Sequence, residues 1–203
     1  STEIQTDVNP AAVVLDCSTR ERVGSFGDVL DHVRIAVIDH HAGGEPFGDV
    51  VYVDTDAPST TVLVQAAIEA SAATPDKQEA ELIFFGLSTD TGFFRHLDLG
   101  SGRAFRAAGR LVDAGASPKD TFNRMFGGKN MESRKLLARL LQRTETHLDG
   151  RIALTYERQE DTAEFGRHNR DSDSLYQLLM GTDQCTVAAL IREENENSCT
   201  GSL

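Results

Sequence analysis

Three short apolar runs, each followed by an aspartate, constrain the fold of this chain more than any other feature. They cover residues 11–15, 34–38 and 50–53, and Asp16, Asp39 and Asp54 follow them directly. Apolar runs rich in β-branched residues and without polar alternation are typical of strands buried on both faces of a parallel sheet. We therefore predict an α/β fold with a parallel sheet, helices on both of its faces and a carboxylate at the end of each of these strands.

The rest of the chain favours helices, followed by a second and smaller α/β unit. Apolar periodicity predicts helices over 61–72, 77–87, 101–114, 118–126 and 131–147. A strand over 151–156, a helix over 174–180 and a strand over 185–192 come next, and a last strand begins near Ser198. The Gly127–Gly128 pair marks the best boundary. We predict a first domain over 1–127, a connecting helix over 128–148 whose leucines pack between the domains, and a second domain over 149–203.

Composition excludes several classes of protein. The chain has 203 residues, of which 32 are acidic and 20 basic, and its formal net charge of -12 disfavours binding along a long nucleic acid or to anionic lipid. No apolar run approaches the roughly 18 residues needed to span a bilayer. Cys17, Cys185 and Cys199 form no CxxC pair, so a zinc knuckle or a disulfide framework is not expected. With no secretory signal in the sequence, we expect a cytoplasmic protein.

Polar side chains with metal-binding chemistry follow two of the predicted strands. Asp16 follows the first strand, and Asp39, His40 and His41 follow the second. Ligands of open parallel α/β sheets bind outside the carboxyl ends of the strands, so these side chains should converge. Carboxylate oxygens and neutral imidazoles suit Mn²⁺ or Mg²⁺, and Asp90, in a Gly-containing turn after the helix over 77–87, offers a further carboxylate. The sequence thus predicts a site for a hard divalent metal.

The same residues resemble the motifs of a known family. Val-Leu-Asp at 14–16, Ile-Asp-His-His at 38–41 and Gly-Leu-Ser-Thr-Asp-Thr-Gly-Phe-Phe-Arg at 86–95 resemble, in order and spacing, the second, third and fourth motifs of the DHH phosphoesterase superfamily. Val-Ala-Ala-Leu-Ile-Arg-Glu at 187–193 is similar to the opening of the DHH-associated C-terminal domain in the nanoRNase and pAp-phosphatase group. The resemblance covers nearly the whole chain, and it implies that the domain over 149–203 binds substrate.

The resemblance also implies a role for each matched residue. Asp16 would bridge two metal ions, and His40 and Asp90 would complete the coordination of the second ion. His41 would face the scissile phosphate as a catalytic residue, and Asp39 would orient the histidine pair. The ions would be Mn²⁺, with Mg²⁺ as the alternative. Two such ions clamp the attacking and leaving oxygens, and a hydroxide between them would be the nucleophile.

Three other residues near these motifs are weaker candidates for contacts with substrate. Ser59 and Thr60 open the helix predicted from residue 61, where backbone N–H groups can donate hydrogen bonds to a phosphate, although ordinary N-capping explains them equally well. Arg95 follows the Asp90 turn closely enough to meet a substrate, although exposed loop arginines are more often solvated.

Two parts of the family pattern are not matched within this sequence. The first motif, which contributes a histidine and two further aspartates, would precede Asp16, and none of the fifteen residues there matches it. The Gly-rich, His-containing motif that grips substrate would lie beyond Leu203. We therefore expect both domains to be incomplete in this sequence, and a chain with these ends to be an inactive fragment that binds at most one metal ion weakly. Tight binding of two Mn²⁺ ions by these 203 residues would contradict this expectation.

The resemblance implies a Mn²⁺-dependent hydrolase of small nucleotides, either 3′-phosphoadenosine 5′-phosphate or very short oligoribonucleotides. The acidic composition agrees, because a short substrate needs no extended basic groove. Alternatives in the same superfamily are a cyclic or linear dinucleotide phosphodiesterase, a single-strand-specific exonuclease and a family II pyrophosphatase, the last disfavoured by the match at 187–193. A non-catalytic nucleotide-binding module is the alternative of another class. The expected partners are thus a small nucleotide or short RNA, not long duplex DNA or a membrane, and the sequence leaves a homodimer open.

Overall fold

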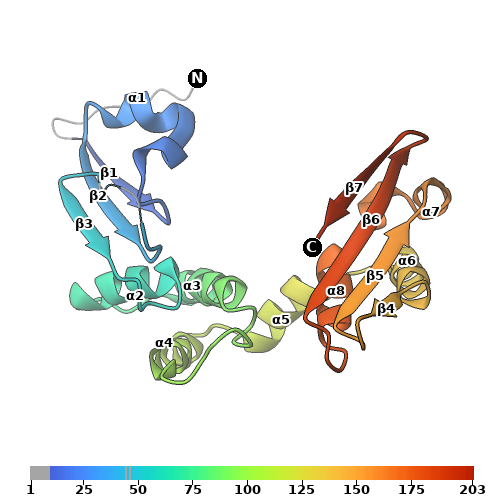
Figure 1. Cartoon of the computed structure of the whole chain (residues 1–203). Helices are drawn as coiled ribbons and strands as arrows, with labels where there is room; N and C mark the ends of the chain where they lie inside the picture. Colours follow the sequence, from blue (N-terminus) through green and yellow to red (C-terminus); the bar gives the residue numbers. More distant parts are fainter. Residues whose placement is uncertain (1–9, 44, 46) are drawn as a thin grey trace. The chain divides into compact units, whose positions relative to one another are not determined.

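The computed structural model describes residues 10–43, 45 and 47–203 (Figure 1). The chain divides into two compact units, Ser1–Met125 and Phe126–Leu203, and the division falls close to the predicted boundary at Gly127. Among the described residues, no helix combines the length and the apolar composition needed to cross a membrane.

The first unit contains a parallel sheet of three strands in the order β1-β2-β3, which confirms the predicted α/β class. The strands are β1 (Ala11–Leu15), β2 (Arg34–Asp39) and β3 (Val50–Val53). Leu15 pairs with Ile38, and Asp39 pairs with Val53. All three strands therefore end at the same edge of the sheet, and the residues that follow them start from neighbouring positions.

The two faces of this sheet differ in burial. On one face Ile35 and Val37 are buried with Leu30, which belongs to the short helix α1 (Gly27–Leu30) after the 3-10 segment η1 (Arg20–Phe26). On the opposite face Val13 and Val50 remain 63% and 58% exposed. The prediction that the first strand is buried on both faces is therefore wrong for the described residues. Apolar character alone cannot tell a strand with two covered faces from a strand with one.

Helices of the first unit form a separate apolar core. It joins Val62, Phe84, Leu87 and Leu111, together with several alanines. The helices that form it are α2 (Thr60–Ala70), α3 (Lys77–Asp90) and α4 (Gly102–Asp113), and α5 (Pro118–Phe126) follows them in the chain. Helix α3 continues to Asp90, beyond the predicted end at residue 87, so Asp90 is placed by a helix rather than by a loop.

The second unit has a four-stranded sheet in the order β4-β5-β6-β7, in which β5 and β6 are parallel and both outer pairs are antiparallel. Its strands are β4 (Glu145–His147), β5 (Ile152–Glu157), β6 (Val187–Asn195) and β7 (Ser198–Ser202). Its helical segments are α6 (Met131–Gln142), α7 (Gln159–Phe165), η2 (Arg167–Asn169) and α8 (Ser172–Met180).

The prediction of a connecting helix that runs to residue 147 is corrected by α6. It ends at Gln142 instead of residue 147, and the residues predicted as its last turn form β4. Leu136, Leu137 and Leu140 pack with Leu175 and other apolar side chains of the second unit. The leucine stripe thus belongs to the core of that unit.

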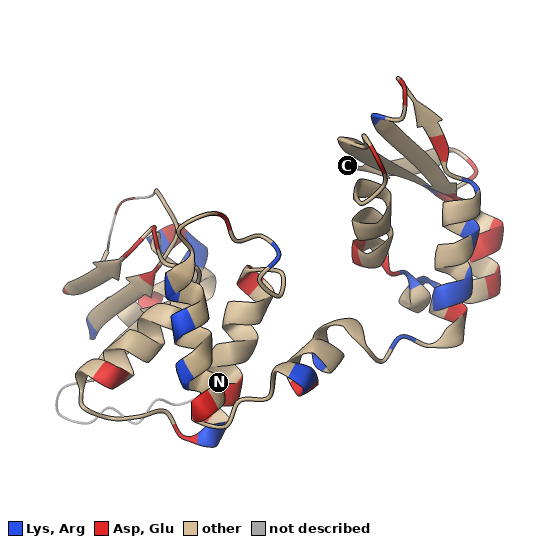
Figure 2. Ribbon diagram, turned by 90° about the horizontal axis from the view of Figure 1, so that it is seen from below, with Lys and Arg blue, Asp and Glu red and all other residues tan. Residues whose placement is uncertain are grey.

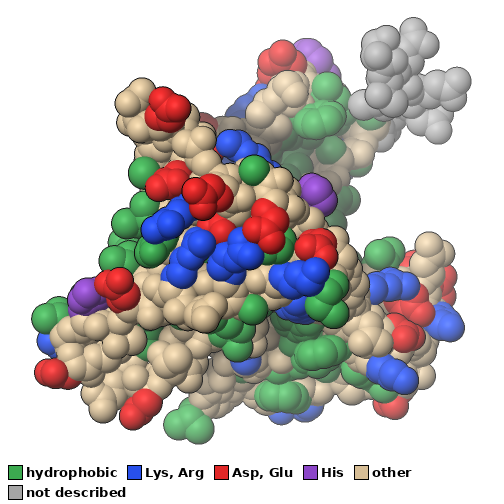
Figure 3. All heavy atoms as spheres, turned by 90° about the vertical axis from the view of Figure 1, so that its right-hand side faces the viewer, with side chains coloured by type: hydrophobic (Ala, Val, Ile, Leu, Met, Phe, Trp, Pro, Cys, Tyr) green, Lys and Arg blue, Asp and Glu red, His purple; other side chains and the backbone are tan. Residues whose placement is uncertain are grey.

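Buried carboxylates in ion pairs join the elements of the second unit, Glu157 within the sheet and to the residue after η2, and Asp161 between α7 and α6. The carboxylate of Glu157, only 1% exposed, accepts hydrogen bonds from Arg170 at 2.8 Å and from Arg192 at 3.0 Å. Asp161 is equally buried and pairs with Arg139 and Arg143. Figure 3 shows basic and acidic side chains intermixed over the face of the molecule that it presents. Since buried charges are stable only when paired, these contacts fix the arrangement of helix and strand.

Replacing Asp161 tests how far the stability of the fold depends on the negative charge of this buried side chain. Burial on its own would raise the pKa of Asp161, but hydrogen bonds from Arg143, the Arg158 backbone N–H and Arg139 outweigh it and leave the pKa below 3.8. The ionised form therefore stabilises the fold above the unfolded-state pKa, and this contribution is lost as the pH falls through the lower folded-state pKa. We expect Asp161→Asn to lower the free energy of unfolding by about 3–5 kcal/mol at pH 7.

Urea unfolding at a series of pH values measures the difference in free energy of unfolding between wild type and Asp161→Asn. This difference should shrink as the pH falls below about 4. The control is Glu164→Gln, because Glu164 is an exposed partner of the same Arg139 and its loss should have a much smaller effect on the free energy of unfolding than the loss of Asp161. An Asp161→Asn deficit that stays constant with pH would contradict the assignment.

Candidate metal centre

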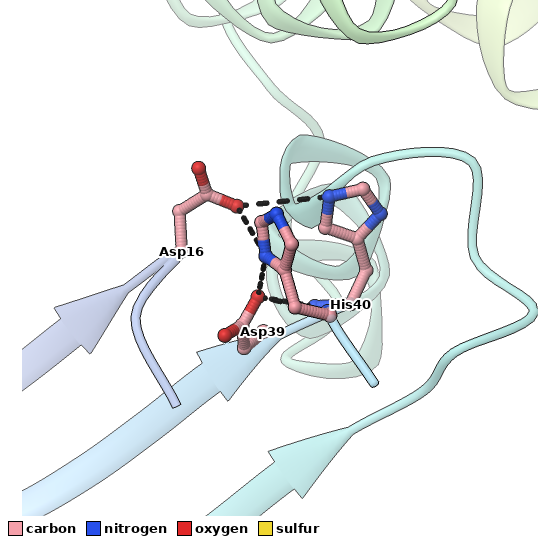
Figure 4. A group of neighbouring side chains, drawn as sticks. Asp16, Asp39 and His40 are labelled. Carbon is pink, nitrogen blue, oxygen red and sulfur yellow. Dashed lines mark hydrogen bonds and ion pairs between the residues drawn. The ribbon is translucent and has the colours of Figure 1, made fainter. Parts of the chain in front are cut away.

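Strand register gathers the motif residues at one edge of the first unit's sheet. Asp16 follows β1, and Asp39 ends β2 beside it, with His40 and His41 next in the chain. Figure 4 shows the side chains of Asp16, Asp39 and His40 pointing toward one another. One ligand atom from each of these four residues lies within 4.8 Å of the others.

His40 lies between two carboxylates. Its Nε2 atom is 3.7 Å from Asp16 Oδ1 and 3.9 Å from Asp90 Oδ2. The structure therefore brings together the three residues predicted as metal ligands, from the end of β1, the loop after β2 and the last turn of α3. Burial raises the pKa of Asp90, and the negative charge of Asp16 adds to that effect, against the opposing influence of His40 and His41.

The hydrogen bond on the other side of the His40 ring indicates what this arrangement can bind. Nδ1 lies 3.3 Å from the carbonyl oxygen of Ala57, which can only accept, so Nδ1 carries the hydrogen of the neutral ring. The lone pair of Nε2 then points toward two carboxylates, and only a cation between them, a metal ion or a proton, relieves the repulsion. A histidine oriented by a carbonyl and two nearby carboxylate oxygens form a donor set that fits Mn²⁺ or Mg²⁺.

Asp39 organises the histidine pair from beneath. Its side chain is fully buried, and Oδ1 accepts hydrogen bonds from His41 Nδ1 at 2.8 Å and from the backbone N–H groups of His40 at 2.6 Å and His41 at 3.1 Å. Burial alone would raise the pKa of Asp39, but the hydrogen bonds, led by that from the His41 side chain, lower it to about 2. The ionised carboxylate holds the His41 ring through Nδ1, so Nε2 is the nitrogen left for other contacts. Asp39 is therefore placed to orient this ring, as the resemblance implies.

Ser59 and Thr60 do not present their hydroxyl groups to a substrate. Both side chains are buried, and Ser59 caps α2 by accepting a hydrogen bond from the Val62 N–H. The Thr60 hydroxyl donates to Asp16 Oδ1 at 2.7 Å. The expected substrate contact, which relied on the backbone N–H groups at the start of α2, remains a prediction. The sequence showed the helix start but not the direction of the two hydroxyls.

Arg95 is exposed, and its only hydrogen bond among the described residues joins Nε to His96 Nε2 at 3.3 Å. No hydrogen bond or ion pair within the described part of the chain connects it to the aspartate and histidine cluster. Its predicted contact with substrate remains a prediction.

Asp54, the carboxylate that follows the third strand, forms an ion pair with Arg103 of α4. This pair ties the turn before α2 to α4.

The turn after Asp90 has a conformation that the sequence did not reveal. Gly92, Phe93 and Phe94 all have positive φ angles, of 57°, 58° and 71°. Such angles are costly for phenylalanine and persist only where the surroundings enforce them. Phe94 stacks on Phe105 with ring centroids 5.3 Å apart and also contacts Phe84. This aromatic packing fixes the segment directly after the last turn that holds Asp90.

Comparisons with known proteins agree with the motifs. No family model matches the chain. The chain is 27% identical over 132 residues to the bifunctional oligoribonuclease and PAP phosphatase NrnA of Bacillus subtilis, covering 63% of this chain and 42% of NrnA. An exopolyphosphatase-related protein from Bacteroides fragilis has the same fold, with a TM-score of 0.77 and 20% identity over 94% of this chain and 57% of that one. A putative family II inorganic pyrophosphatase from Methanococcus jannaschii gives a TM-score of 0.45 at 16% identity, over 90% of this chain and 63% of that one.

These matches confirm the predicted resemblance to the DHH phosphoesterase superfamily, in sequence through NrnA and in fold through the Bacteroides fragilis protein. The chain spans about half the length of these relatives, 42% of the first and 57% of the second. What the relatives do therefore comes to this chain only as a proposal.

Removing the His40 imidazole should abolish metal binding with little effect on the fold, because its side chain lies at the sheet edge outside the apolar cores. We expect Mn²⁺ to raise the melting temperature of the chain by preferential binding to the folded state, and His40→Ala to eliminate that rise. His147→Ala is the control, since His147 lies in the second unit beside Glu145. The measurement is thermal unfolding with and without Mn²⁺. An equal Mn²⁺ response in wild type and His40→Ala would show that the cluster does not bind the ion.

Proposed function

We propose that the protein containing this chain is a metal-dependent phosphoesterase that hydrolyses small nucleotides, either 3′-phosphoadenosine 5′-phosphate or very short oligoribonucleotides. One observation carries the proposal: His40 Nε2 lies between the carboxylates of Asp16 and Asp90, at 3.7 Å and 3.9 Å. The relative NrnA, whose name states both activities, supports the choice of substrate.

In this proposal Asp16, His40 and Asp90 hold a divalent cation, Mn²⁺ or alternatively Mg²⁺. When bound, such an ion lowers the pKa of a coordinated water and polarises a phosphoryl oxygen. Asp16 offers a half-exposed carboxylate to the ion, and the Ala57 carbonyl orients the His40 ring through Nδ1 and leaves Nε2 as the nitrogen available to a metal ion.

His41 supplies the remaining chemistry. Asp39 holds its Nδ1, so Nε2 is the atom that faces outward from a ring that is 44% exposed. A nitrogen in this position can donate a hydrogen bond to a phosphate oxygen when protonated, or exchange a proton with a leaving oxygen. The hydrogen bond to the buried Asp39 carboxylate holds the ring in one orientation while it acts.

The distribution of charge favours a short substrate. Figure 2 shows Lys and Arg interspersed with Asp and Glu along the helices of each unit. A long strand requires a continuous basic groove, whereas a dinucleotide needs the cation and a few local donors. The net charge of -12 points the same way.

Parallel assays of the full-length protein with Mn²⁺ test the substrate. The four substrates are 3′-phosphoadenosine 5′-phosphate, a diribonucleotide, a long single strand and pyrophosphate. We expect turnover of one or both of the first two, and preference for the long strand or for pyrophosphate would overturn the proposal. Tight nucleotide binding without any hydrolysis would instead indicate a binding module.

Loss of the His41 imidazole should slow the reaction without removing the metal. We expect His41→Ala to lower kcat by about 10²- to 10⁴-fold, the range for a lost acid or base group, because the proposed ligands Asp16, His40 and Asp90 are retained. His147→Ala, in the second unit, is the matched histidine control and should keep the wild-type rate. Steady-state kinetics with Mn²⁺ measure both variants, and an unchanged kcat in His41→Ala would contradict the role given to this residue.

A further inference from the structure

We propose that Thr60 is a positioning residue of the metal centre, whose hydroxyl fixes the carboxylate of Asp16 in the orientation that receives a divalent cation. This inference rests on the proposed function, because it assumes that the cluster binds a metal ion. It assigns the Thr60 side chain a role toward Asp16, apart from the backbone contact with substrate expected from the sequence.

Thr60 reaches Asp16 from a distant part of the chain. It is the first residue of α2, is 4% exposed, and lies where the helix begins near the edge of the sheet. Its Oγ1 is 2.7 Å from Asp16 Oδ1 and 3.5 Å from Asp39 Oδ1. A threonine hydroxyl has one hydrogen to donate, and both partners are carboxylate oxygens, so the hydrogen goes to the nearer oxygen, that of Asp16.

Asp16 has few other restraints. Its backbone has a φ of 60°, an angle that non-glycine residues rarely adopt, and its N–H donates to the Ile38 carbonyl at 3.0 Å. Its side chain is 55% exposed, and the nearest histidine nitrogens, His40 Nε2 at 3.7 Å and His41 Nδ1 at 3.6 Å, are beyond hydrogen-bond distance. Within the described residues, Thr60 is therefore the single hydrogen-bond donor to this carboxylate.

The hydroxyl is not needed to begin the helix. Ser59 caps α2 through its own side chain, and Ser59 Oγ also lies 2.8 Å from Thr61 Oγ1. The Thr60 hydroxyl is therefore left to tie α2 to the carboxylate at the end of β1. A neutral donor between Asp16 and Asp39 also offsets part of the repulsion between two carboxylates that must lie close together before any cation arrives.

Loss of this hydrogen bond should therefore weaken metal binding. Removing the partner that orients a ligand typically costs about 10- to 100-fold in metal affinity. Thr60→Val keeps the shape of the side chain and removes only the donor, while Thr60→Ser keeps the donor and removes a methyl group.

Titration calorimetry of the 203-residue chain with Mn²⁺ tests the proposal. We expect Thr60→Val to raise the Kd for Mn²⁺ by about 10- to 100-fold and Thr60→Ser to restore it to within about threefold of wild type. Thr155→Val is the matched control, because Thr155 in the second unit is also buried and donates to the Leu140 carbonyl at 2.6 Å. It should lower the melting temperature and leave the Kd for Mn²⁺ unchanged.

The outcomes separate this proposal from the one on which it rests. Unchanged Mn²⁺ affinity in Thr60→Val, or Thr60→Ser as weak as Thr60→Val, would overturn the positioning role while leaving the metal site intact. Asp16→Ala reports on the site itself. Should wild type bind no Mn²⁺, or should Asp16→Ala bind it as well as wild type, the metal centre and the positioning role both fail.

Discussion

The rest of the candidate site depends on the hydrogen bonds that the buried carboxylate of Asp39 accepts. It accepts hydrogen bonds from the two backbone N–H groups that follow it and from the His41 ring, which sets the direction in which the chain leaves β2. These donors all meet Oδ1, and they offset the cost of withdrawing the charge from water, while Oδ2 is buried with no hydrogen-bond partner among the described residues. The same bonds to Oδ1 decide where His40 and His41 point, so the burial of Asp39 and the geometry of the site have one cause.

Parallel strand register extends this local arrangement to segments that are distant in sequence. Because Leu15 pairs with Ile38, the residue after β1 must lie beside the end of β2. Helix α2 then begins at the same edge, held by the Ser59 cap, and α3 delivers Asp90 from its last turn. Asp90 thus lies within a helix, and Asp16 and His40 directly follow strands, so regular elements limit the positions of all three proposed ligands.

The α/β fold and the grouping of the site residues at one sheet edge could be predicted from the sequence, because strand order and strand ends determine both. A carboxylate after each of two neighbouring parallel strands must converge, so the grouping of Asp16 with Asp39, His40 and His41 follows from strand recognition alone. Side-chain direction is different. Nothing in the residues shows that Thr60 turns toward Asp16, that three consecutive residues from Gly92 adopt positive φ angles, or that Arg192 pairs with a buried Glu157 instead of facing solvent. Those features depend on tertiary packing, as does the exposure of one face of β1, which strand periodicity cannot report.

The ion pairs also bear on what the protein can bind. Many of the 20 basic residues are already committed to carboxylates, among them Arg103, Arg110, Arg139, Arg143, Arg170 and Arg192. A guanidinium paired with a carboxylate releases little free energy on meeting a phosphate, because it must first lose its partner. Electrostatic attraction along a nucleic-acid backbone is therefore weak in this chain. Under the proposed function, affinity for a phosphorylated ligand would come from a cation held by Asp16, His40 and Asp90. Such a cation would contact the ligand at one phosphate rather than along a strand, which is the physical basis for proposing a small nucleotide over a polymer.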